Sequence, residues 1–186
     1  MHSSHPFFVL WIFWIIYWIA SSSGTKRTVH TARSRGRSFA FLVIIALLIL
    51  SNDGRLPWLM RHLYEPGRAL EIFGLILCAG GIAFAIWARR YLGTNWSAQP
   101  TLKEGHELIM TGPYRYVRHP IYTGLLLAIF GTVLASGRIF DFLVLAYLVI
   151  DTHFKAKIEE SLMLQQFPDT YPAYRAKIKA IIPFVL

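Results

Sequence analysis

Long apolar runs alternate with short polar stretches along the whole chain. The apolar runs are Pro6–Ala20, Phe39–Leu50, Ala69–Trp87, Ile121–Ala135 and Ile139–Ile150. A helix that crosses a bilayer needs about 20 mostly apolar residues, and each run approaches that length once its flanks are included. We therefore predict an all-α fold, a multi-pass transmembrane helical bundle with about five spans.

Turn-forming residues separate these runs and predict how the last of them connect. Ser136–Arg138 places a glycine between two apolar runs, which predicts a tight helical hairpin. Asp151–Phe167 then keeps a helical repeat of apolar residues, and Pro168 and Pro172 end it. Upstream, Asn52–Gly67 carries the turn signals NDG and EPG and is expected to form a loop.

Composition and charge agree with a membrane protein of one domain. The 186 residues are 55% hydrophobic, the formal net charge is +9, and Cys78 is the single cysteine, so no intramolecular disulfide can form. A strongly basic chain can bind nucleic acid, but here the basic residues fall in the gaps between apolar runs. We expect them to contact the lipid bilayer rather than nucleic acid.

The positions of the basic residues predict the orientation of the spans. Residues 25–38, 88–120 and 151–186 hold fifteen of the 19 Lys and Arg residues, whereas 51–68 and Arg138 hold the other four. Because cytoplasmic loops carry the excess of Lys and Arg, the N-terminus is expected outside and the C-terminus in the cytoplasm. So compact a chain is expected in a prokaryotic plasma membrane.

The segment Gln99–Gly124 is the longest stretch that neither a packed core nor a lipid span requires. It holds two histidines, two arginines and three tyrosines. Pro120 is expected in the first turn of the following helix, where its missing N–H costs nothing. Arg115, Arg118 and His119 would then gather at a helix N-terminus, which favours anionic groups of a ligand. A basic, aromatic membrane anchor explains the same residues equally well.

The two helices of the predicted hairpin are antiparallel, so the start of the first and the end of the second lie on the same side of the membrane and must be neighbours. Residues 119–122 and 151–160 should therefore meet on the cytoplasmic side and form a polar cup, a common ligand site in helix bundles. Lys155 and Glu159 could instead form an exposed pair one helical turn apart. The predicted cup residues are Tyr114, Arg118, His119, Tyr122, Lys155 and Glu159.

Other residues are assigned structural roles. Gly74, Cys78, Gly80 and Gly81 are small residues on one predicted span and should allow a neighbouring helix to approach closely. Trp96 is interpreted as an anchor at the membrane interface. The histidines show no close pairing of metal ligands, so no metal site is expected.

A specific set of motifs follows in order through the C-terminal half: HELI at 106–109, GPYRYVRHPIYTG at 112–124, the apolar hairpin, the pair Glu159–Glu160, and FPDTYPAY at 167–174. This set resembles the isoprenylcysteine carboxyl methyltransferase family, integral-membrane enzymes that use S-adenosylmethionine. The resemblance implies two regions. Residues 89–186 would bind the cofactor, and residues 1–88, three hydrophobic spans, would give access to the methyl acceptor.

The resemblance also implies roles for individual residues. Lys155 matches a basic residue that contacts the substrate in the family, where an arginine is usual. Lysine keeps the charge but loses the bidentate geometry that suits a carboxylate. Glu160 is interpreted as a solvated residue. The implied cofactor contacts are Gln99, His106, Glu107, Leu108, Ile109, Tyr114, His119, Pro120, Ile121, Tyr122 and Glu159.

The implied function is methyl transfer from S-adenosylmethionine to a lipophilic or prenylated acceptor, such as an isoprenylcysteine carboxylate. A carboxylate acceptor needs no general base, so no catalytic residue is assigned. For an amine or a thiol, Glu159 or His119 could accept the proton. The alternatives are a phospholipid N-methyltransferase, an NADPH enzyme related to sterol reductases, and a membrane scaffold without enzymatic activity.

Overall fold

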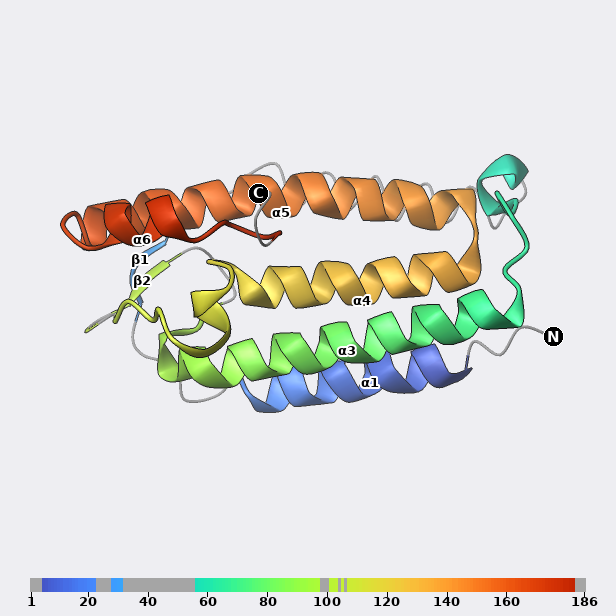
Figure 1. Ribbon diagram of the computed structural model, residues 1–186, viewed down its shortest axis with the longest axis horizontal. Helices are drawn as coiled ribbons and strands as arrows, with labels where there is room; N and C mark the ends of the chain where they lie inside the picture. Colours follow the sequence, from blue (N-terminus) through green and yellow to red (C-terminus); the bar gives the residue numbers. More distant parts are fainter. Residues whose placement is uncertain are drawn as a thin grey trace.

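The fold is mostly helical, as predicted (Figure 1). The computed structural model describes residues 5–22, 28–31, 56–97, 101–103, 105 and 107–182. The predicted span Phe39–Leu50 lies outside these residues. In chain order the elements are α1 (His5–Ala20), β1 (Thr28–Thr31), the 3₁₀ helix η1 (Pro57–Met60), α3 (Arg68–Leu92), the 3₁₀ helix η2 (Gly93–Asn95), β2 (Thr101–Lys103), the 3₁₀ helix η3 (Gly112–Arg115), α4 (Pro120–Ser136), α5 (Ile139–Gln166) and α6 (Tyr171–Lys177).

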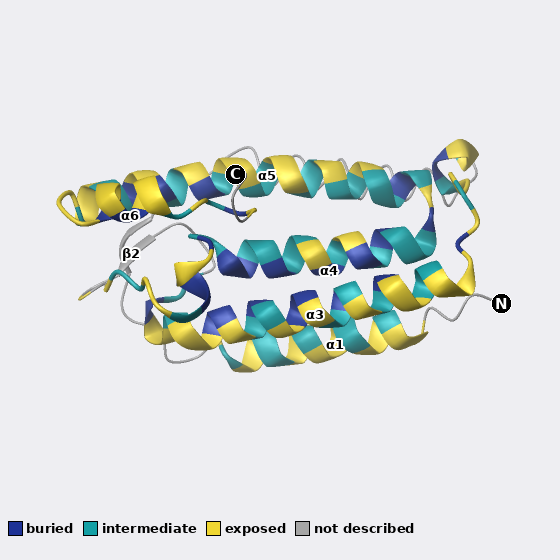
Figure 2. Cartoon of the chain, in the orientation of Figure 1, coloured by how far each residue is buried: buried dark blue, intermediate teal, exposed yellow. Residues whose placement is uncertain are grey.

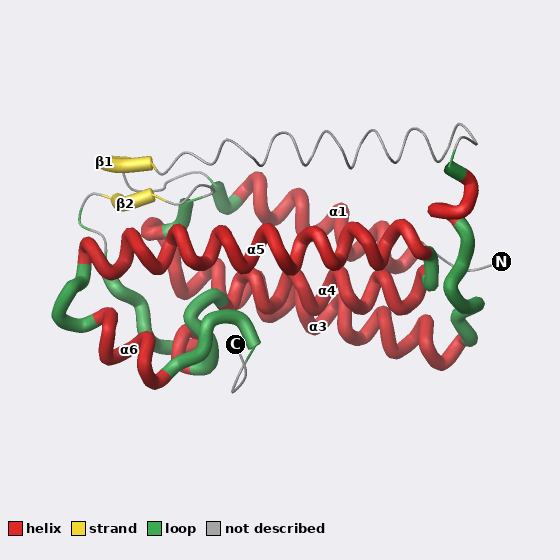
Figure 3. Tube along the Cα trace, turned by 90° about the horizontal axis from the view of Figure 1, so that it is seen from above, coloured by secondary structure: helices red, strands yellow, loops and turns green. Residues whose placement is uncertain are grey.

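Four long helices lie alongside one another in the order α1, α3, α4 and α5 (Figures 1 and 3). Helices α1, α3 and α5 run toward the same end of the bundle, and α4 runs in the opposite direction. That end also holds β1, β2, η3 and α6, and we call it the motif end (Figure 3). The other end holds η1 and the turn between α4 and α5, and we call it the turn end.

The hairpin between α4 and α5 confirms the sequence prediction. Pro120 is the first residue of α4, and α5 continues without a break from Ile139 to Gln166. Gly137 joins the two helices with a left-handed φ of 66°, a conformation that favours glycine. Its carbonyl oxygen accepts a hydrogen bond of 2.7 Å from the Leu63 N–H, which holds the chain before α3 against the turn.

The sequence did not predict the short sheet at the motif end. Strands β1 and β2 pair antiparallel, with Thr31 opposite Thr101 and Thr28 opposite Lys103. Strand β1 has the sequence TVHT, and its β-branched threonines and valine favour extended backbone. The all-α description therefore holds for the bundle but not for the whole described chain.

Small residues bring α3 and α4 into close contact. A Cβ atom added to Gly81 would overlap the carbonyl oxygen of Gly124, and one added to Gly74 would overlap that of Gly131. Cys78 lies between these two contacts and is fully buried. The predicted packing role is therefore confirmed for three of the four small residues. Gly80 is exposed with open space around it, so its assignment to the contact was wrong.

Replacing Gly81 by alanine is expected to destabilise the protein by at least about 1 kcal/mol, because the added methyl group pushes two backbones apart. Thermal unfolding in detergent would measure the change. Gly80→Ala is the matched control on the adjacent position, where the methyl group meets nothing. Equal melting temperatures for the two variants would contradict the close contact.

Large apolar side chains cover the outside of the bundle. No residue of α1 is buried, and Phe8 and Ile19 are 68% and 69% exposed. Figure 2 shows α1 in the colours of exposed and intermediate residues only. An apolar surface of this extent belongs in hydrocarbon rather than water, which places the bundle in a membrane.

Among the described residues, one helix is long and apolar enough to cross a bilayer by itself, the 28-residue stretch Arg68–Asn95. Helices α1 and α4 are also apolar but have only 16 and 17 residues. An α-helix rises about 1.5 Å per residue, so each of them is slightly shorter than a hydrocarbon core of about 30 Å. The number of spans therefore stays a prediction.

Candidate active site

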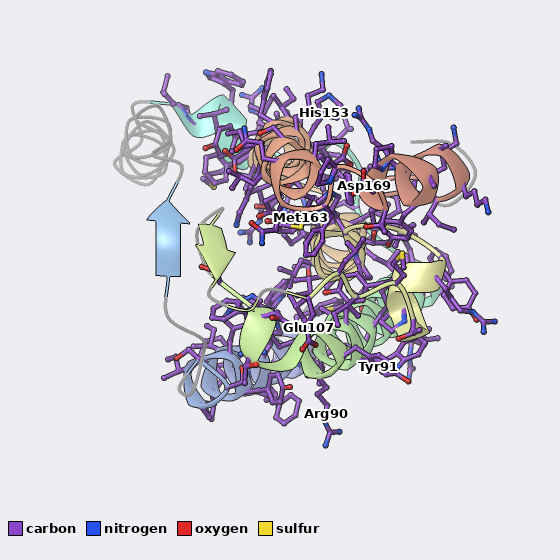
Figure 4. The ribbon with its side chains drawn as sticks, turned by 90° about the vertical axis from the view of Figure 1, so that its left-hand side faces the viewer. Arg90, Tyr91, Glu107, His153, Met163 and Asp169 are labelled. Atoms are coloured by element: carbon purple, nitrogen blue, oxygen red, sulfur yellow. The ribbon has the colours of Figure 1, made fainter. Side chains whose placement is uncertain are left out.

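A cavity of about 300 Å³ opens at the motif end of the bundle. Helices α1, α3, α4, α5 and α6 all contribute to its wall. Figure 4 looks onto this end, with Glu107 and Met163 of the lining labelled. Its volume is at the lower end of the range for small-molecule sites. Charged and polar groups line the side formed by α4 and α5, whereas the rings of Trp14 and Trp18 of α1 and of Trp96, just after η2, line the opposite side.

The cavity brings together most of the residues singled out from the sequence. Pro120 is buried in the first turn of α4 but does not line the cavity. Gln99 and His106 lie outside the described residues. The predicted residues that line the cavity are Glu107, Leu108, Ile109, Tyr114, Arg118, His119, Ile121, Tyr122, Lys155 and Glu159.

His119, Tyr122 and Glu159 form a connected group on the polar side. Nδ1 of His119 lies 3.3 Å from Oε2 of Glu159, and the hydroxyl of Tyr122 donates a hydrogen bond to Oε1 of the same carboxylate. The rings of His119 and Tyr122 stack with centroids 5.5 Å apart. The predicted meeting of the two hairpin ends is therefore confirmed.

Lys155 belongs to the same group through the Tyr122 ring. Its Nζ lies 5.0 Å from the ring centroid, within the range of a cation–π contact. Lys155 and Glu159 both line the cavity, so they are more than an exposed pair on a solvated helix face. The ammonium of Lys155 and the carboxylate of Glu159 thus both face the cavity from α5, and the ring of Tyr122 on α4 lies beside them.

Glu160 is buried, which corrects its interpretation as a solvated residue. Its side chain is only 7% exposed, and its Oε1 accepts hydrogen bonds of 2.8 and 2.5 Å from Nε and Nη2 of Arg118. Nε of Arg175 lies 3.2 Å from Oε2, and Nε2 of His119 lies 3.3 Å from Oε1. Glu160 therefore ties α5 to the segment before α4 and to α6. Arg118 also donates to the Arg175 carbonyl oxygen at 3.2 Å.

The two glutamates control the protonation of His119. Burial alone would lower the pKa of His119, but hydrogen bonds to Glu159 and Glu160 and their charges outweigh it and raise the pKa above its usual value. Burial likewise works to raise the pKa of Glu159, and the contacts with His119, Lys155 and Tyr122 lower it overall. The pKa of Glu160 falls to about 2, because His119 and Arg118 outweigh the effect of burial. His119 therefore lies between two carboxylates, and their contacts favour its protonated, cationic form.

Sequence reasoning missed the aromatic side of the cavity. Trp14 and Trp18 of α1 stack with centroids 5.2 Å apart, and Trp18 meets the edge of Trp96 at 5.5 Å. All three rings line the cavity, so Trp96 contributes to the candidate site, and its role as an interface anchor stays a prediction. The sequence shows tryptophans four residues apart on one helix face, but it does not show which neighbour that face meets.

Arg89 fastens this aromatic side to the rest of the bundle. Arg89 is only 5% exposed, and its guanidinium lies 4.5 Å from the Trp96 ring centroid and donates a 2.8 Å hydrogen bond to the Gly93 carbonyl oxygen. It also donates to the carbonyl oxygen of Ser21 just after α1. The ends of α1 and α3 are both C-termini, where helix dipoles favour a positive charge. One buried arginine therefore holds two helix ends together.

Helix α6 closes the cavity from the side of the C-terminal segment. Tyr171 and Tyr174 are buried, and both line the cavity. The Tyr174 hydroxyl donates a 2.6 Å hydrogen bond to the Tyr114 carbonyl oxygen. Burial is the main cause that raises the pKa of Tyr174 to about 12, so its hydroxyl stays protonated. The FPDTYPAY motif was the signal for these residues in the sequence.

Comparisons with known proteins agree with this geometry. The family model described as phospholipid methyltransferase matches residues 70–170 of the chain. The protein-S-isoprenylcysteine O-methyltransferase of Schizosaccharomyces pombe is 35% identical over 82 residues, which are 43% of this chain and 34% of that protein. The structure of the eukaryotic intramembrane Ras methyltransferase ICMT (isoprenylcysteine carboxyl methyltransferase) matches with a TM-score of 0.55 and 23% identity, over 83% of this chain and 54% of the other.

The fold is similar to that of the solved membrane methyltransferase. The chain belongs to the phospholipid methyltransferase family, whose match covers more than half of its residues. The resemblance drawn from the sequence motifs is confirmed, and the family match begins at residue 70, so it includes nearly all of α3. The chain spans about a third of the length of the curated relative and about half of the solved structure.

Proposed function

We propose that the protein is an integral-membrane methyltransferase that transfers a methyl group from S-adenosylmethionine to a lipophilic acceptor. The observation that carries the proposal is the His119–Tyr122–Glu159 group on the cavity wall, which lies inside the segment matched by the family model. The names of the relatives and of the family point to the same chemistry. The cavity faces the motif end, where water-soluble and membrane-bound reactants can meet.

The lining suits the separate parts of S-adenosylmethionine, which when bound supplies a methyl group on a cationic sulfonium. The faces of the tryptophans attract a cation. The carboxylate of Glu159 suits an ammonium group or ribose hydroxyls, and the ammonium of Lys155 suits a carboxylate. The buried rings of Tyr114 and Tyr174 offer surfaces for an aromatic base. The groups present therefore fit the cofactor without any added donor.

The protonation of the site favours a carboxylate acceptor over an amine. Both ring nitrogens of His119 are directed to glutamates, and these contacts raise its pKa, so they favour the form that already carries the proton and make His119 a poorer proton acceptor. Glu159 has a lowered pKa and is a weak base. An amine has to lose a proton during methylation, whereas a carboxylate does not. Alignment of the reactants and exclusion of water are then the main contributions of the protein.

Both expected regions of the chain contribute to the cavity in this proposal. Residues 89–186 supply the polar side, and α1 supplies Trp14 and Trp18 on the aromatic side. An acceptor with an apolar chain would lie against these tryptophans and Leu125, which continue from the cavity toward the interior of the bundle. A lipophilic small molecule or a prenylated peptide fits this description.

Methyl transfer can be tested by incubating the purified protein with S-adenosylmethionine labelled on the methyl group and a total lipid extract. We expect label in the organic phase that alkali releases as methanol, since a methyl ester is cleaved by base. The family description favours a second candidate, a phospholipid amine, whose N-methyl label would resist alkali. The Glu159→Gln variant is the matched control. No transfer to a lipid extract or to a prenylcysteine would contradict the proposal.

Cofactor choice can be tested without knowing the acceptor. S-adenosylmethionine and its demethylated product should each raise the melting temperature of the detergent-purified protein, because a ligand at 100 times its Kd adds about 2.7 kcal/mol of stability. NADPH should have little effect, since its pyrophosphate needs several cationic donors together and Arg118 is already paired with Glu160. Stabilisation by NADPH alone would favour the reductase alternative.

We also infer that the motif end is cytoplasmic, from the positions of the basic residues. A cysteine introduced at exposed Leu63, in a Cys78→Ala background, should react with a membrane-impermeant thiol reagent on intact cells. A cysteine introduced at exposed Asp169 beside α6 should react only after the cells are opened (Figure 4). The reverse pattern would invert the orientation.

A further inference from the structure

A second cavity lies between α1 and α3 and shares no lining residue with the first. Its volume is about 350 Å³. Seven apolar residues and one cation line it, and we call it the α1–α3 groove. The lining includes Leu10 and Phe13 of α1 and, on α3, Ala79, Ala83, Trp87 and Arg90.

The charge of the groove is concentrated at one end. Arg90 is exposed and lies in the last turn of α3, and Figure 4 shows its side chain pointing away from the bundle. Within the described part of the chain, no carboxylate forms an ion pair with it. Arg118, by contrast, is paired with Glu160. The groove is therefore an apolar channel with a free cation at the motif end.

The length of the groove matches one leaflet of a bilayer. Ala79 and Arg90 are eleven residues apart on α3, which corresponds to about 16 Å along the helix. Half of the hydrocarbon core is about 15 Å. If Arg90 lies at the level of the lipid headgroups, Ala79 lies near the middle of the bilayer. Trp87 then lies close to the membrane interface, where tryptophan is common.

We propose that the α1–α3 groove is a binding site for an anionic phospholipid of the leaflet at the motif end. One acyl chain lies between α1 and α3 against Phe13 and Ala83, and the phosphate pairs with Arg90. The apolar lining supplies the contact area for the chain. The net charge of the headgroup selects for anionic over zwitterionic lipid, because a basic residue near an anionic membrane surface contributes about 1 kcal/mol.

Binding at this groove supports the wall of the first cavity. Phe13 faces the groove, whereas the next residue, Trp14, lines the first cavity, so α1 separates the two spaces. No residue of α1 is buried by the rest of the described chain. A lipid in the groove adds contacts on the outer side of α1 and holds Trp14 and Trp18 in place. Anionic lipid should therefore stabilise the folded protein.

The test uses the full chain in mixed micelles that contain dioleoyl phosphatidylglycerol or dioleoyl phosphatidylcholine. Thermal unfolding and native mass spectrometry would report stabilisation and the number of bound lipids. We expect phosphatidylglycerol to raise the melting temperature of the wild type more than phosphatidylcholine does. Arg90→Gln should weaken the apparent affinity for phosphatidylglycerol about fivefold, the equivalent of roughly 1 kcal/mol, and remove the preference over phosphatidylcholine.

Two further variants separate the groove from general charge effects. Ala83→Trp fills the groove and should abolish the stabilisation by both lipids. Arg115→Gln makes the same charge change at an exposed residue of the motif end outside the groove, and it should behave as the wild type. Wild-type lipid responses in both Arg90→Gln and Ala83→Trp would overturn the proposal. So would an equal loss in Arg90→Gln and Arg115→Gln, or no response of the wild type to phosphatidylglycerol.

Discussion

Replacing Glu160 by alanine is expected to destabilise the folded protein by about 3–5 kcal/mol, the usual cost of removing one partner from a buried ion pair. The carboxylate is 7% exposed and receives Arg118 and Arg175 as cationic partners. Without it, the largely buried guanidinium of Arg118 keeps its desolvation cost but loses its counter-charge. The contact between α5, α6 and the start of α4 should loosen as well.

Thermal and denaturant unfolding in detergent would measure this change. Asp169→Ala is the matched control, because it removes an exposed carboxylate at the same end of the bundle. Glu160→Gln should lie between the alanine variant and the wild type, since the amide keeps some hydrogen bonds but not the charge. A melting temperature of Glu160→Ala equal to that of Asp169→Ala would show that the ion pairs make no net contribution.

The pH dependence of stability gives an independent measure of the same residue. The pKa of Glu160 is about 2 in the folded protein and 4.5 for the free side chain. The folded state therefore binds fewer protons than the unfolded state in this window, and Glu160 contributes its full stability above about pH 4.5. That contribution should be lost as the pH falls from about 4.5 toward 2. The Glu160→Gln variant should lack this part of the acid transition.

The hairpin shows what could be predicted from the sequence. Pro120 marks a helix start and Gly137 a helix end, and both signals depend on local backbone geometry. Two apolar runs joined by a three-residue turn have to lie antiparallel, so residues at their outer ends must meet. The proximity of His119 and Glu159 follows from these local facts alone.

The roles of Glu159 and Glu160 show what the sequence could not predict. Adjacent residues on a helix point about 100° apart, so one of the two faces the cavity and the other faces α6. The choice depends on the rotation of α5, which is fixed by packing against segments far away in the chain. The FPDTYPAY motif also did not predict where α6 lies. The chain turns at 167–170, and this turn brings α6, which begins at Tyr171, against the cavity.

The aromatic side of the cavity was unpredictable for a similar reason. Trp14 and Trp18 are separated from Trp96 by more than seventy residues. Their contact depends on the docking of α1 on α3, which Arg89 fixes through carbonyl oxygens at both helix ends. An arginine at the end of an apolar run is typical of a membrane interface, so the sequence offered no reason to bury it.

His119→Ala and Glu159→Gln are each expected to weaken the binding of S-adenosylmethionine by about 1.5–3 kcal/mol, or roughly 10- to 150-fold in Kd. In the alanine variant, the two carboxylates at 159 and 160 lose the imidazole ring between them. In the glutamine variant, the cavity loses the negative charge that meets an ammonium group or ribose hydroxyls.

Calorimetry on the detergent-purified variants would measure both affinities, with unfolding curves to confirm that each variant is folded. His153→Ala is the matched control, because His153 is exposed on the same helix as Glu159 and does not line the cavity (Figure 4). The two active-site variants should also be less than additive when combined, since each removes the same contact between imidazole and carboxylate. Wild-type affinity in both folded variants would mean that the His119–Tyr122–Glu159 group does not contact the cofactor. The group would then be expected to contact the methyl acceptor instead.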